Sequence, residues 1–186
     1  MAGIEDSNES DLIDQVKSGG RRAFDQLVEP HVPRLLALAR RMLASPSEAE
    51  EAVQNALASV WINRQRLDAS RAVGGYLTTV MLNKCRDRLR RRKAASFLGF
   101  GNGMEEAIAA DDASDPERTA ADREDLARVR REIERLPVRL REALVLVTID
   151  GRSQSEAAEL LGVTEKTIET RIYRARGRLR ENLRFS

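Results

Sequence analysis

The chain has 186 residues, which suffices for one ordinary domain or for two small domains of about 70 to 90 residues each. One cysteine (Cys85) and one histidine (His31) exclude a disulfide framework and a zinc site built from this chain alone. Aromatic residues are only 4% of the sequence, and Ala, Leu, Arg and Glu dominate, so the composition favours helices over strands. We therefore predict an all-α protein.

The formal net charge is only +2, but the charges are segregated along the chain. Residues 84–93 are almost wholly basic, residues 105–125 are mostly acidic, and residues 166–184 are basic again. Two basic blocks separated by an acidic one indicate two contacts with a polyanion, although solvated helix faces would give the same pattern.

The start of the chain and its hydropathy argue against export. Residues 1–10 are acidic and polar without an apolar run. No stretch approaches the roughly 18 to 20 apolar residues that are needed to cross a bilayer. We therefore expect a cytoplasmic protein without membrane insertion.

Residues 11–66 are predicted to be helical. Apolar side chains recur at helical spacing over residues 11–44, and the Gly19-Gly20 pair interrupts them, which predicts two helices there. The next helix, to about Arg66, has a start signal: Ser45 as the cap, then Pro46, then Glu48 to complete a capping box. Its apolar stripe is ordinary core, with Trp61 included. Its opposite face carries Glu51, Gln54, Asn55, Ala58 and Ile62, which only weakly favours a partner surface.

A further helix is predicted from Tyr76 to about Lys93, after a turn over residues 68–75. Its buried side carries Leu77, Val80, Met81, Cys85 and Leu89, so Cys85 is interpreted as a core residue. Its other side aligns Asn83, Arg86, Arg90 and Lys93. A basic face that ends in an amide suits phosphates and base edges.

Residues 96–118 are predicted to be a flexible linker, because three glycines break the periodicity and residues 111–116 are acidic and turn-forming. We therefore divide the chain into a domain of residues 11–95, a linker of residues 96–118 and a domain of residues 119–186.

The strongest pattern is a helix-turn-helix over residues 153–176. Ser153 and Glu156 form a capping box for its first helix, Gly162 allows the tight turn, and Thr164 caps the second helix. Ala158 is small enough for the helices to cross closely. The second helix buries Ile168, Ile172, Ala175, Leu179 and Leu183.

The outer face of that second helix is typical of DNA recognition. It presents Lys166, Thr167, Thr170, Arg171, Arg174 and Arg178. The first of these side chains would meet base edges in a major groove, and the later arginines would hold phosphates. A helical hairpin with a charged face is the alternative.

Two segments carry a resemblance to a known family. The run from Leu136-Pro137 through the helix-turn-helix to Leu179 resembles region 4 of bacterial sigma factors, although response-regulator output domains have similar helix-turn-helices. The first half resembles sigma region 2 in residues 48–54, Trp61, Tyr76-Leu77, Asn83, Asp87 and residues 89–91. The linker is too short for the extra domain of larger sigma factors. The chain is thus similar to the extracytoplasmic-function group of the sigma-70 family.

The resemblance implies a region 2 helical bundle, a region 4 helix-turn-helix and a non-enzymatic role in transcription initiation, without a cofactor or metal. By resemblance, Glu48, Glu51, Gln54 and Asn55 bind the β′ clamp helices of core RNA polymerase. Region 4 would contact the β flap and read the upstream promoter element through the recognition helix. The element near the start site would be bound by Tyr76, Asn83, Arg86, Arg90 and Lys93. The turn at residues 68–75 would hold a flipped base.

Alternative functions remain open at this point. A dimeric helix-turn-helix regulator would bind a two-fold operator without core polymerase. An enzyme acting on nucleic acid is disfavoured, because the acidic pair Asp111 and Asp112 falls in the linker without a basic or metal-binding partner. The resemblance also implies regulation by an anti-sigma factor.

Overall fold

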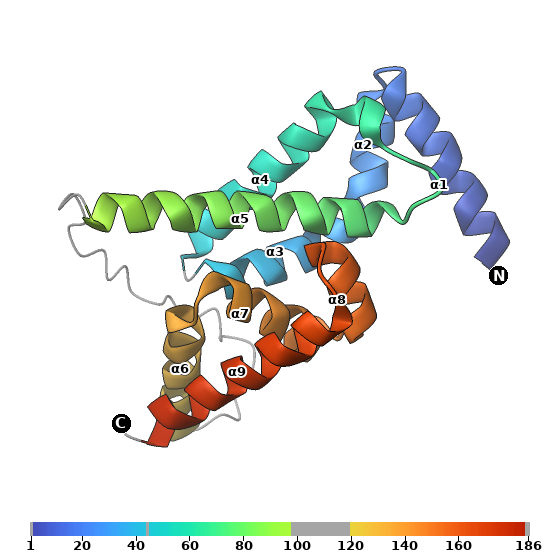
Figure 1. The fold of residues 1–186 in the computed structure, drawn as a ribbon. Helices are drawn as coiled ribbons and strands as arrows, with labels where there is room; N and C mark the ends of the chain where they lie inside the picture. The colour runs from blue at the N-terminus through green and yellow to red at the C-terminus, as the bar shows by residue number, and fades with distance from the viewer. Residues whose placement is uncertain (1, 44, 98–119, 185–186) are drawn as a thin grey trace.

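The computed structural model describes residues 2–43, 45–97 and 120–184, and these ranges are helical without strands, as the composition predicted. The amino-terminal domain comprises α1 (Ala2–Lys17), α2 (Arg21–Val28), η1 (Glu29–His31), α3 (Val32–Met42), α4 (Pro46–Ile62), η2 (Arg64–Arg66) and α5 (Val73–Phe97). The carboxy-terminal domain comprises α6 (Ala120–Arg135), α7 (Val138–Leu144), the π-helical turn η3 (Val145–Ile149), α8 (Gln154–Leu161) and α9 (Glu165–Arg184). Figure 1 shows the two domains one above the other.

The prediction of two helices over residues 11–44 was wrong, because α1, α2 and α3 all cross this stretch. The missed boundary lies at two prolines. Pro30 occupies the first turn of η1, and Pro33 occupies the first turn of α3. Proline has no N–H and is tolerated where a helix begins, so each proline marks a new start rather than a position inside one helix.

The start of α4 agrees only in part with the predicted capping box. Ser45 Oγ accepts a hydrogen bond from the Glu48 N–H at 3.3 Å, which confirms the cap. The Glu48 carboxylate instead accepts a bond from Arg88 Nε of α5 at 3.0 Å. The side chain of Glu48 therefore joins two helices rather than closing the turn of its own helix.

The amino-terminal core lies between α3, α4 and α5. Leu35, Met42, Val60, Leu77 and Met81 are buried there, and burial of one such side chain stabilises the fold by about 1.5–3 kcal/mol. Trp61 packs at the edge of this core, with the Phe24 ring 5.3 Å away in an edge-on arrangement and the guanidinium groups of Arg21 and Arg64 over its ring.

Cys85 lies in this core, as predicted. It is fully buried beside the sulfur of Met81, and burial raises the pKa of the thiol to about 12. A thiol with so high a pKa is protonated at neutral pH and is a poor nucleophile.

The helix-turn-helix of α8 and α9 is confirmed in its local details. The side chains and backbones of Ser153 and Glu156 exchange both bonds of the capping box. Gly162 ends α8 in the left-handed region, with φ 63° and ψ 40°. Thr164 Oγ1 accepts a bond from the Thr167 N–H at 3.2 Å, which caps α9. Ala158 is buried.

A chain of charges runs from the end of η3 into α8. The Asp150 N–H bonds to the carbonyl oxygen of Val145 at 2.9 Å, which closes the wide turn. The Asp150 carboxylate accepts a bond from Arg152 Nε at 3.2 Å, and Arg152 Nη1 lies 3.6 Å from Glu156 Oε1. These charges connect η3 with the first turn of α8.

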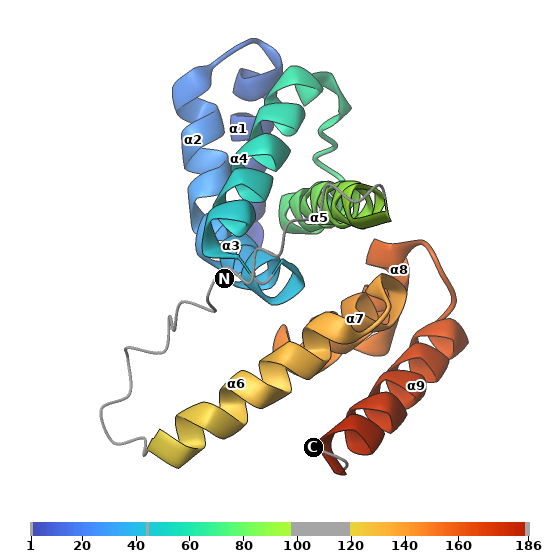
Figure 2. The ribbon, with the colours of Figure 1, turned by 90° about the vertical axis from the view of Figure 1, so that its left-hand side faces the viewer.

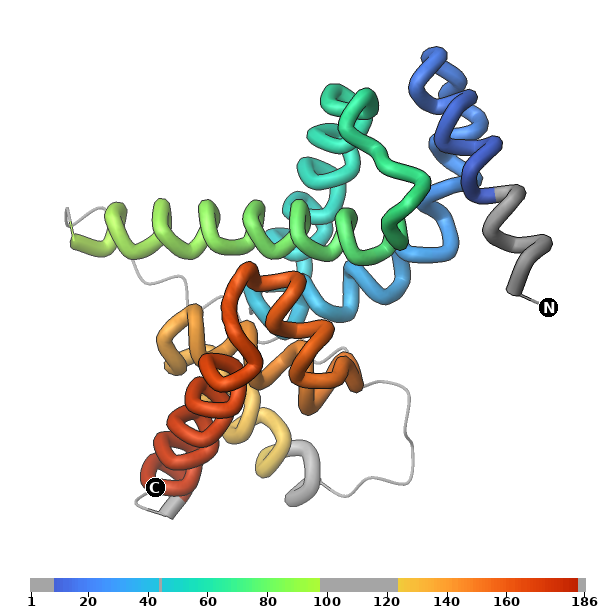
Figure 3. Tube along the Cα trace, turned by 45° about the vertical axis from the view of Figure 1, so that its right-hand side comes forward, coloured from blue at the N-terminus to red at the C-terminus, as the bar shows by residue number. Residues whose placement is uncertain are grey.

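The apolar core continues from one domain into the other. One cluster of buried side chains includes Leu35 and Leu77 of the first domain together with Leu146, Ala157 and Ile168 of the second. Figures 2 and 3 show α8 lying close to α5, and α3 contacts η3 and α6. The predicted linker falls on residues outside the described ranges except for Ser96 and Phe97, which belong to the last turn of α5.

Candidate nucleic-acid interface

The basic face predicted on the α5 helix is present but unequally exposed. Asn83, Arg90 and Lys93 are exposed, whereas Arg86 and Tyr76 are half-buried. Tyr76 and Lys93 are seventeen positions apart, which corresponds to about 25 Å along a helix, so this face forms a track rather than a compact site. The end of α5 extends beyond the neighbouring helices (Figure 3).

Two residues of this track have partners that limit their freedom. Arg86 donates through Nη1 to Asn83 Oδ1 at 2.7 Å and forms an ion pair through Nε with Glu142 of α7. Arg90 forms an ion pair with Asp87, one turn earlier on the same helix. The contact with Glu142 joins the two domains and has no counterpart in the sequence patterns.

The Asp68 carboxylate makes local hydrogen bonds in the turn before α5. Asp68 Oδ1 accepts bonds from the backbone N–H and the hydroxyl of Ser70, at 2.9 and 2.7 Å. These bonds lower the pKa of Asp68, with a smaller contribution from Arg71. The side chains of Asp68, Ser70 and Arg71 remain exposed, so the turn presents polar groups to the surroundings.

The predicted polymerase-binding residues share α4 but differ in exposure. Glu51, Gln54 and Asn55 are exposed, and Ile62 at the end of the same face is 73% exposed. Glu48 is half-buried because its carboxylate is held by Arg88, which also lies 3.3 Å from Glu51 Oε2. The hydrogen bond that Arg88 donates to Glu48 raises the pKa of Arg88.

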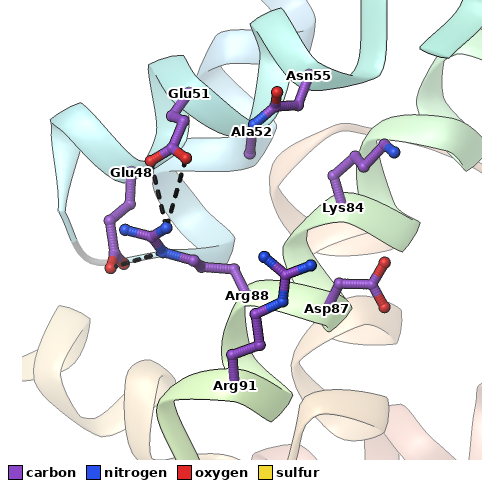
Figure 4. A pocket seen from close by; sticks show the side chains of 8 residues that line it. All are labelled: Glu48, Glu51, Ala52, Asn55, Lys84, Asp87, Arg88 and Arg91. Atoms are coloured by element: carbon purple, nitrogen blue, oxygen red, sulfur yellow. Dashed lines mark hydrogen bonds and ion pairs between the residues drawn. The ribbon is translucent and has the colours of Figure 1, made fainter.

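A mixed-charge cleft separates α4 from α5 beside this strip. Figure 4 shows Arg88 reaching across to the two glutamates, while Lys84 and Arg91 of the same helix have no dashed contact to them. It is lined by Glu48, Glu51, Ala52, Asn55, Lys84, Asp87, Arg88 and Arg91. The carboxylates on α4 and the cations on α5 therefore meet at one edge.

The recognition face predicted on α9 is largely exposed. Lys166, Thr170, Arg174 and Arg178 are exposed, and Thr167 and Arg171 are half-buried. The Lys166 ammonium lies 2.7 Å from Glu169 Oε2, and the Thr170 hydroxyl donates to the carbonyl oxygen of Lys166 at 2.8 Å. The first turn of this face therefore has its polar groups oriented by local bonds.

Tyr173 belongs to this face, although the sequence analysis omitted it. It is 74% exposed and lies three residues after Thr170 and seven after Lys166, so the three side chains share one side of the helix. The helical spacing of Tyr173 from Lys166 and Thr170 would have placed it on this face from the sequence alone. The buried side opposite contains Ile168, Ile172 and Ala175, as predicted.

The two cationic faces are separate surfaces. In Figures 1 and 2, α7 and α8 lie between α5 and α9. Among the residues that the structure describes, no group of three or more His, Cys, Asp or Glu side chains is arranged to hold a metal ion. Among the described helices, none combines the length and apolar character required of a membrane span.

Comparison with known proteins accounts for both halves of the chain. The family Sigma-70 region 2 matches residues 27–95, and the family Sigma-70, region 4 matches residues 126–179. The chain is 37% identical over 172 residues to the RNA polymerase sigma factor CnrH of Cupriavidus metallidurans, with 90% of each protein covered. It is 34% identical over 179 residues to the ECF RNA polymerase sigma factor SigM of Mycobacterium tuberculosis, covering 96% of this chain and 86% of that protein.

Solved structures give the same result. The fold is similar to CnrH in complex with the cytosolic domain of CnrY, with a TM-score of 0.67 and 31% identity over 96% of this chain and 99% of that one. It is also similar to the sigma factor RpoE in complex with the anti-sigma factor NepR from Bartonella quintana, with a TM-score of 0.69 and 26% identity over 87% and 96% of the two chains. A stand-alone dimeric regulator would not need the region 2 half. The chain belongs to the extracytoplasmic-function group of the sigma-70 family of RNA polymerase sigma factors.

Proposed function

We propose that this sigma factor binds core RNA polymerase and directs it to promoters, where it supports melting and the start of transcription. The observation that carries the proposal is the presence of both regions in one chain, in order, over residues 27–95 and 126–179. Each region contributes a helix whose exposed side chains include several arginines. The proposal assigns recognition and binding energy to this chain and assigns nucleotide chemistry to the core enzyme.

We assign core-enzyme binding to the exposed strip of α4. Glu51, Gln54 and Asn55 would contact the β′ clamp helices, and Ile62 extends the strip with an apolar side chain. Glu48 would act through Arg88, because their ion pair positions Arg88 beside Glu51. Region 4 would contact the β flap.

We assign the two promoter elements to the two cationic helices. The α9 face would enter a major groove, where Lys166 and Thr170 reach base edges and Arg174 and Arg178 hold phosphates. The α5 track would bind the melted strand near the start site. Flipping a base out of a duplex costs a few kcal/mol, and a cationic track together with the polar turn at residues 68–72 would offset that cost.

We extend the comparison to regulation. The two solved relatives are sigma factors in complexes with CnrY and NepR, and NepR is an anti-sigma factor. We propose that an anti-sigma factor also binds this chain, and that the protein works in the cytoplasm, where its polymerase is found.

Transcription in vitro with purified bacterial core enzyme tests the proposal. Added chain is expected to create defined start sites on a pool of genomic fragments, and alignment of their upstream sequences would give the promoter. A chain that redirects core enzyme to no start site would refute the proposal. Tight binding to palindromic duplex without polymerase would instead support the dimeric regulator.

An Arg174→Ala variant tests the assignment of the recognition face. Removal of one phosphate contact is expected to lower promoter-specific transcription several-fold and to reduce its salt dependence, with co-elution with core enzyme retained. Arg22→Ala is the matched control, because it removes one exposed guanidinium from α2, outside all three proposed surfaces. Equal activity of the two variants would refute the assignment.

A further inference from the structure

Helix α1 contacts both ends of the turn that leads into α5. At the carboxyl end of α1, the Lys17 carbonyl oxygen accepts a hydrogen bond from the Gln65 amide of η2 at 2.9 Å. Earlier in α1, the Glu9 carboxylate accepts a bond at 3.4 Å from the N–H of Val73, the first residue of α5. Figures 1 and 3 show the segment between η2 and α5 running toward α1. One helix therefore bridges the two flanks of this turn.

Helix α1 is itself fixed in the amino-terminal core. Ile13 and Val16 lie between the two contacts and are fully buried. Glu9 and Lys17 are eight positions apart, which corresponds to about 12 Å along a helix. A helix that is anchored by buried side chains between its two contacts supports the turn rigidly.

The start of α5 needs outside support because of its sequence. Gly74 and Gly75 occupy its first turn, and glycine is a poor helix former because it loses the most conformational freedom on folding. The Val73 N–H is also one of the first N–H groups of a helix, which have no acceptor within the helix. The Glu9 carboxylate supplies that acceptor, and its negative charge suits the positive end of the helix dipole.

His31 of η1 packs against the same turn of α5. A Cβ added at Gly74 would lie 3.0 Å from both Cε1 and Nδ1 of the His31 ring, so the glycine allows the ring to approach the backbone. Burial lowers the pKa of His31 and Glu9 partly opposes this shift, which indicates that the carboxylate lies near the ring. Elements α1, η1 and α5 therefore meet around Glu9.

We infer that α1 positions the turn that receives the flipped base, with Glu9 as the positioning residue. The inference rests on the proposed function, which assigns capture of that base to the turn at residues 68–72. A turn that is already ordered loses less conformational entropy when a base binds, so more of the binding energy offsets unstacking. Because α1 precedes the matched residues 27–95, the inference extends the part of the chain that is used in promoter melting.

Promoter opening by the holoenzyme tests the inference, on a promoter identified by the transcription assay. Permanganate oxidation of unpaired thymines measures the fraction of open complexes. An abasic residue is placed in turn at each position of the non-template strand in the element near the start site. The position at which opening by the wild type falls most identifies the captured base.

Glu9→Ala removes the contact with Val73 and is expected to lower the fraction of open complexes about fivefold, the order expected for loss of a hydrogen bond to a charged group. On the template that lacks the captured base, Glu9→Ala and the wild type are expected to be equal, because the turn then has no base to bind. Glu9→Gln keeps an oxygen acceptor and is expected to retain most of the opening. Asp11→Ala is the matched control, because it removes an exposed carboxylate from the same helix.

Two results would overturn the positioning role of Glu9. One is equal opening of the intact promoter by Glu9→Ala and Asp11→Ala. The other is a loss of the same size on the abasic template, because such a loss would come from folding or assembly and not from the captured base.

Gln65→Ala keeps the inference testable if Glu9→Ala fails to fold. Gln65 is exposed, and the change removes only the second contact of α1. It is expected to lower opening of the intact promoter and to have no effect on the abasic template. Gln15→Ala is its control, because it removes an exposed amide from α1. Equal opening by these two variants would overturn the role of α1.

The wild-type chain separates this inference from the proposed function. A wild type that opens no promoter with core enzyme refutes the sigma-factor proposal, and one that is insensitive to every abasic position refutes base capture. A wild type that depends on one base, while Glu9→Ala opens the promoter normally, refutes only the positioning role.

Discussion

The same substitution, glycine to alanine, is predicted to have opposite effects at two positions of the helix-turn-helix. Gly162 ends α8 with φ at +63°, whereas Gly177 lies inside the α9 helix. A Cβ added at either position would meet no atom within 4 Å. Backbone conformation alone therefore decides the outcome.

The magnitudes follow from that difference. An L-residue in the left-handed region costs about 1–2 kcal/mol, and the lower entropy of the unfolded alanine chain returns about 0.4–1 kcal/mol of this. Gly162→Ala is thus expected to destabilise the protein by about 1 kcal/mol. Gly177→Ala is expected to stabilise it by about 0.5–1 kcal/mol, because glycine is a poor helix former.

Urea denaturation followed by circular dichroism measures both effects. The two midpoints should move in opposite directions with unchanged slopes, and the melting temperature should change by about 2–4 °C per kcal/mol. Gly162→Asn should lie between Gly162→Ala and the wild type, since asparagine tolerates the left-handed region. Shifts of the same sign at both positions would refute the reasoning.

Three further predictions concern the surfaces and the pH dependence. Glu51→Arg combined with Gln54→Ala should abolish co-elution with core enzyme, and normal co-elution would remove the α4 assignment. Tyr173→Ala should lower promoter-specific transcription several-fold with an unchanged melting temperature, because the ring is exposed; full activity would exclude a DNA contact. Burial lowers the pKa of His31 below its ordinary value of 6.5, and Glu9 opposes this shift with a smaller effect. The contribution of His31 to stability is therefore complete above pH 6.5 and is lost as the pH falls through the lower pKa of the folded state. His31→Gln should flatten that part of the stability profile.

Features set by neighbouring residues were predictable from the sequence. The capping box at Ser153, the left-handed Gly162 and the cap at Thr164 each depend on residues at most a few positions apart. The fully buried Cys85 and the exposed Ile62 followed from helical periodicity in the same way. The exposed recognition face followed too, apart from the omission of Tyr173.

Features set by distant residues were not predictable. Glu48 is paired with a residue forty positions away, and Arg86 with one fifty-six positions away. Helical periodicity gives the side of a helix on which a residue lies but not the partner that approaches it. For the same reason, the predicted division into two domains did not anticipate that buried side chains of α3, α5 and α8 belong to one core.

The carboxylate of Asp150 binds Arg34 on one side and Arg152 on the other, and Arg152 reaches the glutamate that caps α8. Loss of this one side chain would therefore disturb the position of the helix-turn-helix and also its attachment to the amino-terminal domain. A variant at Asp150 is therefore expected to change the position of α8 and the contact between the two domains together.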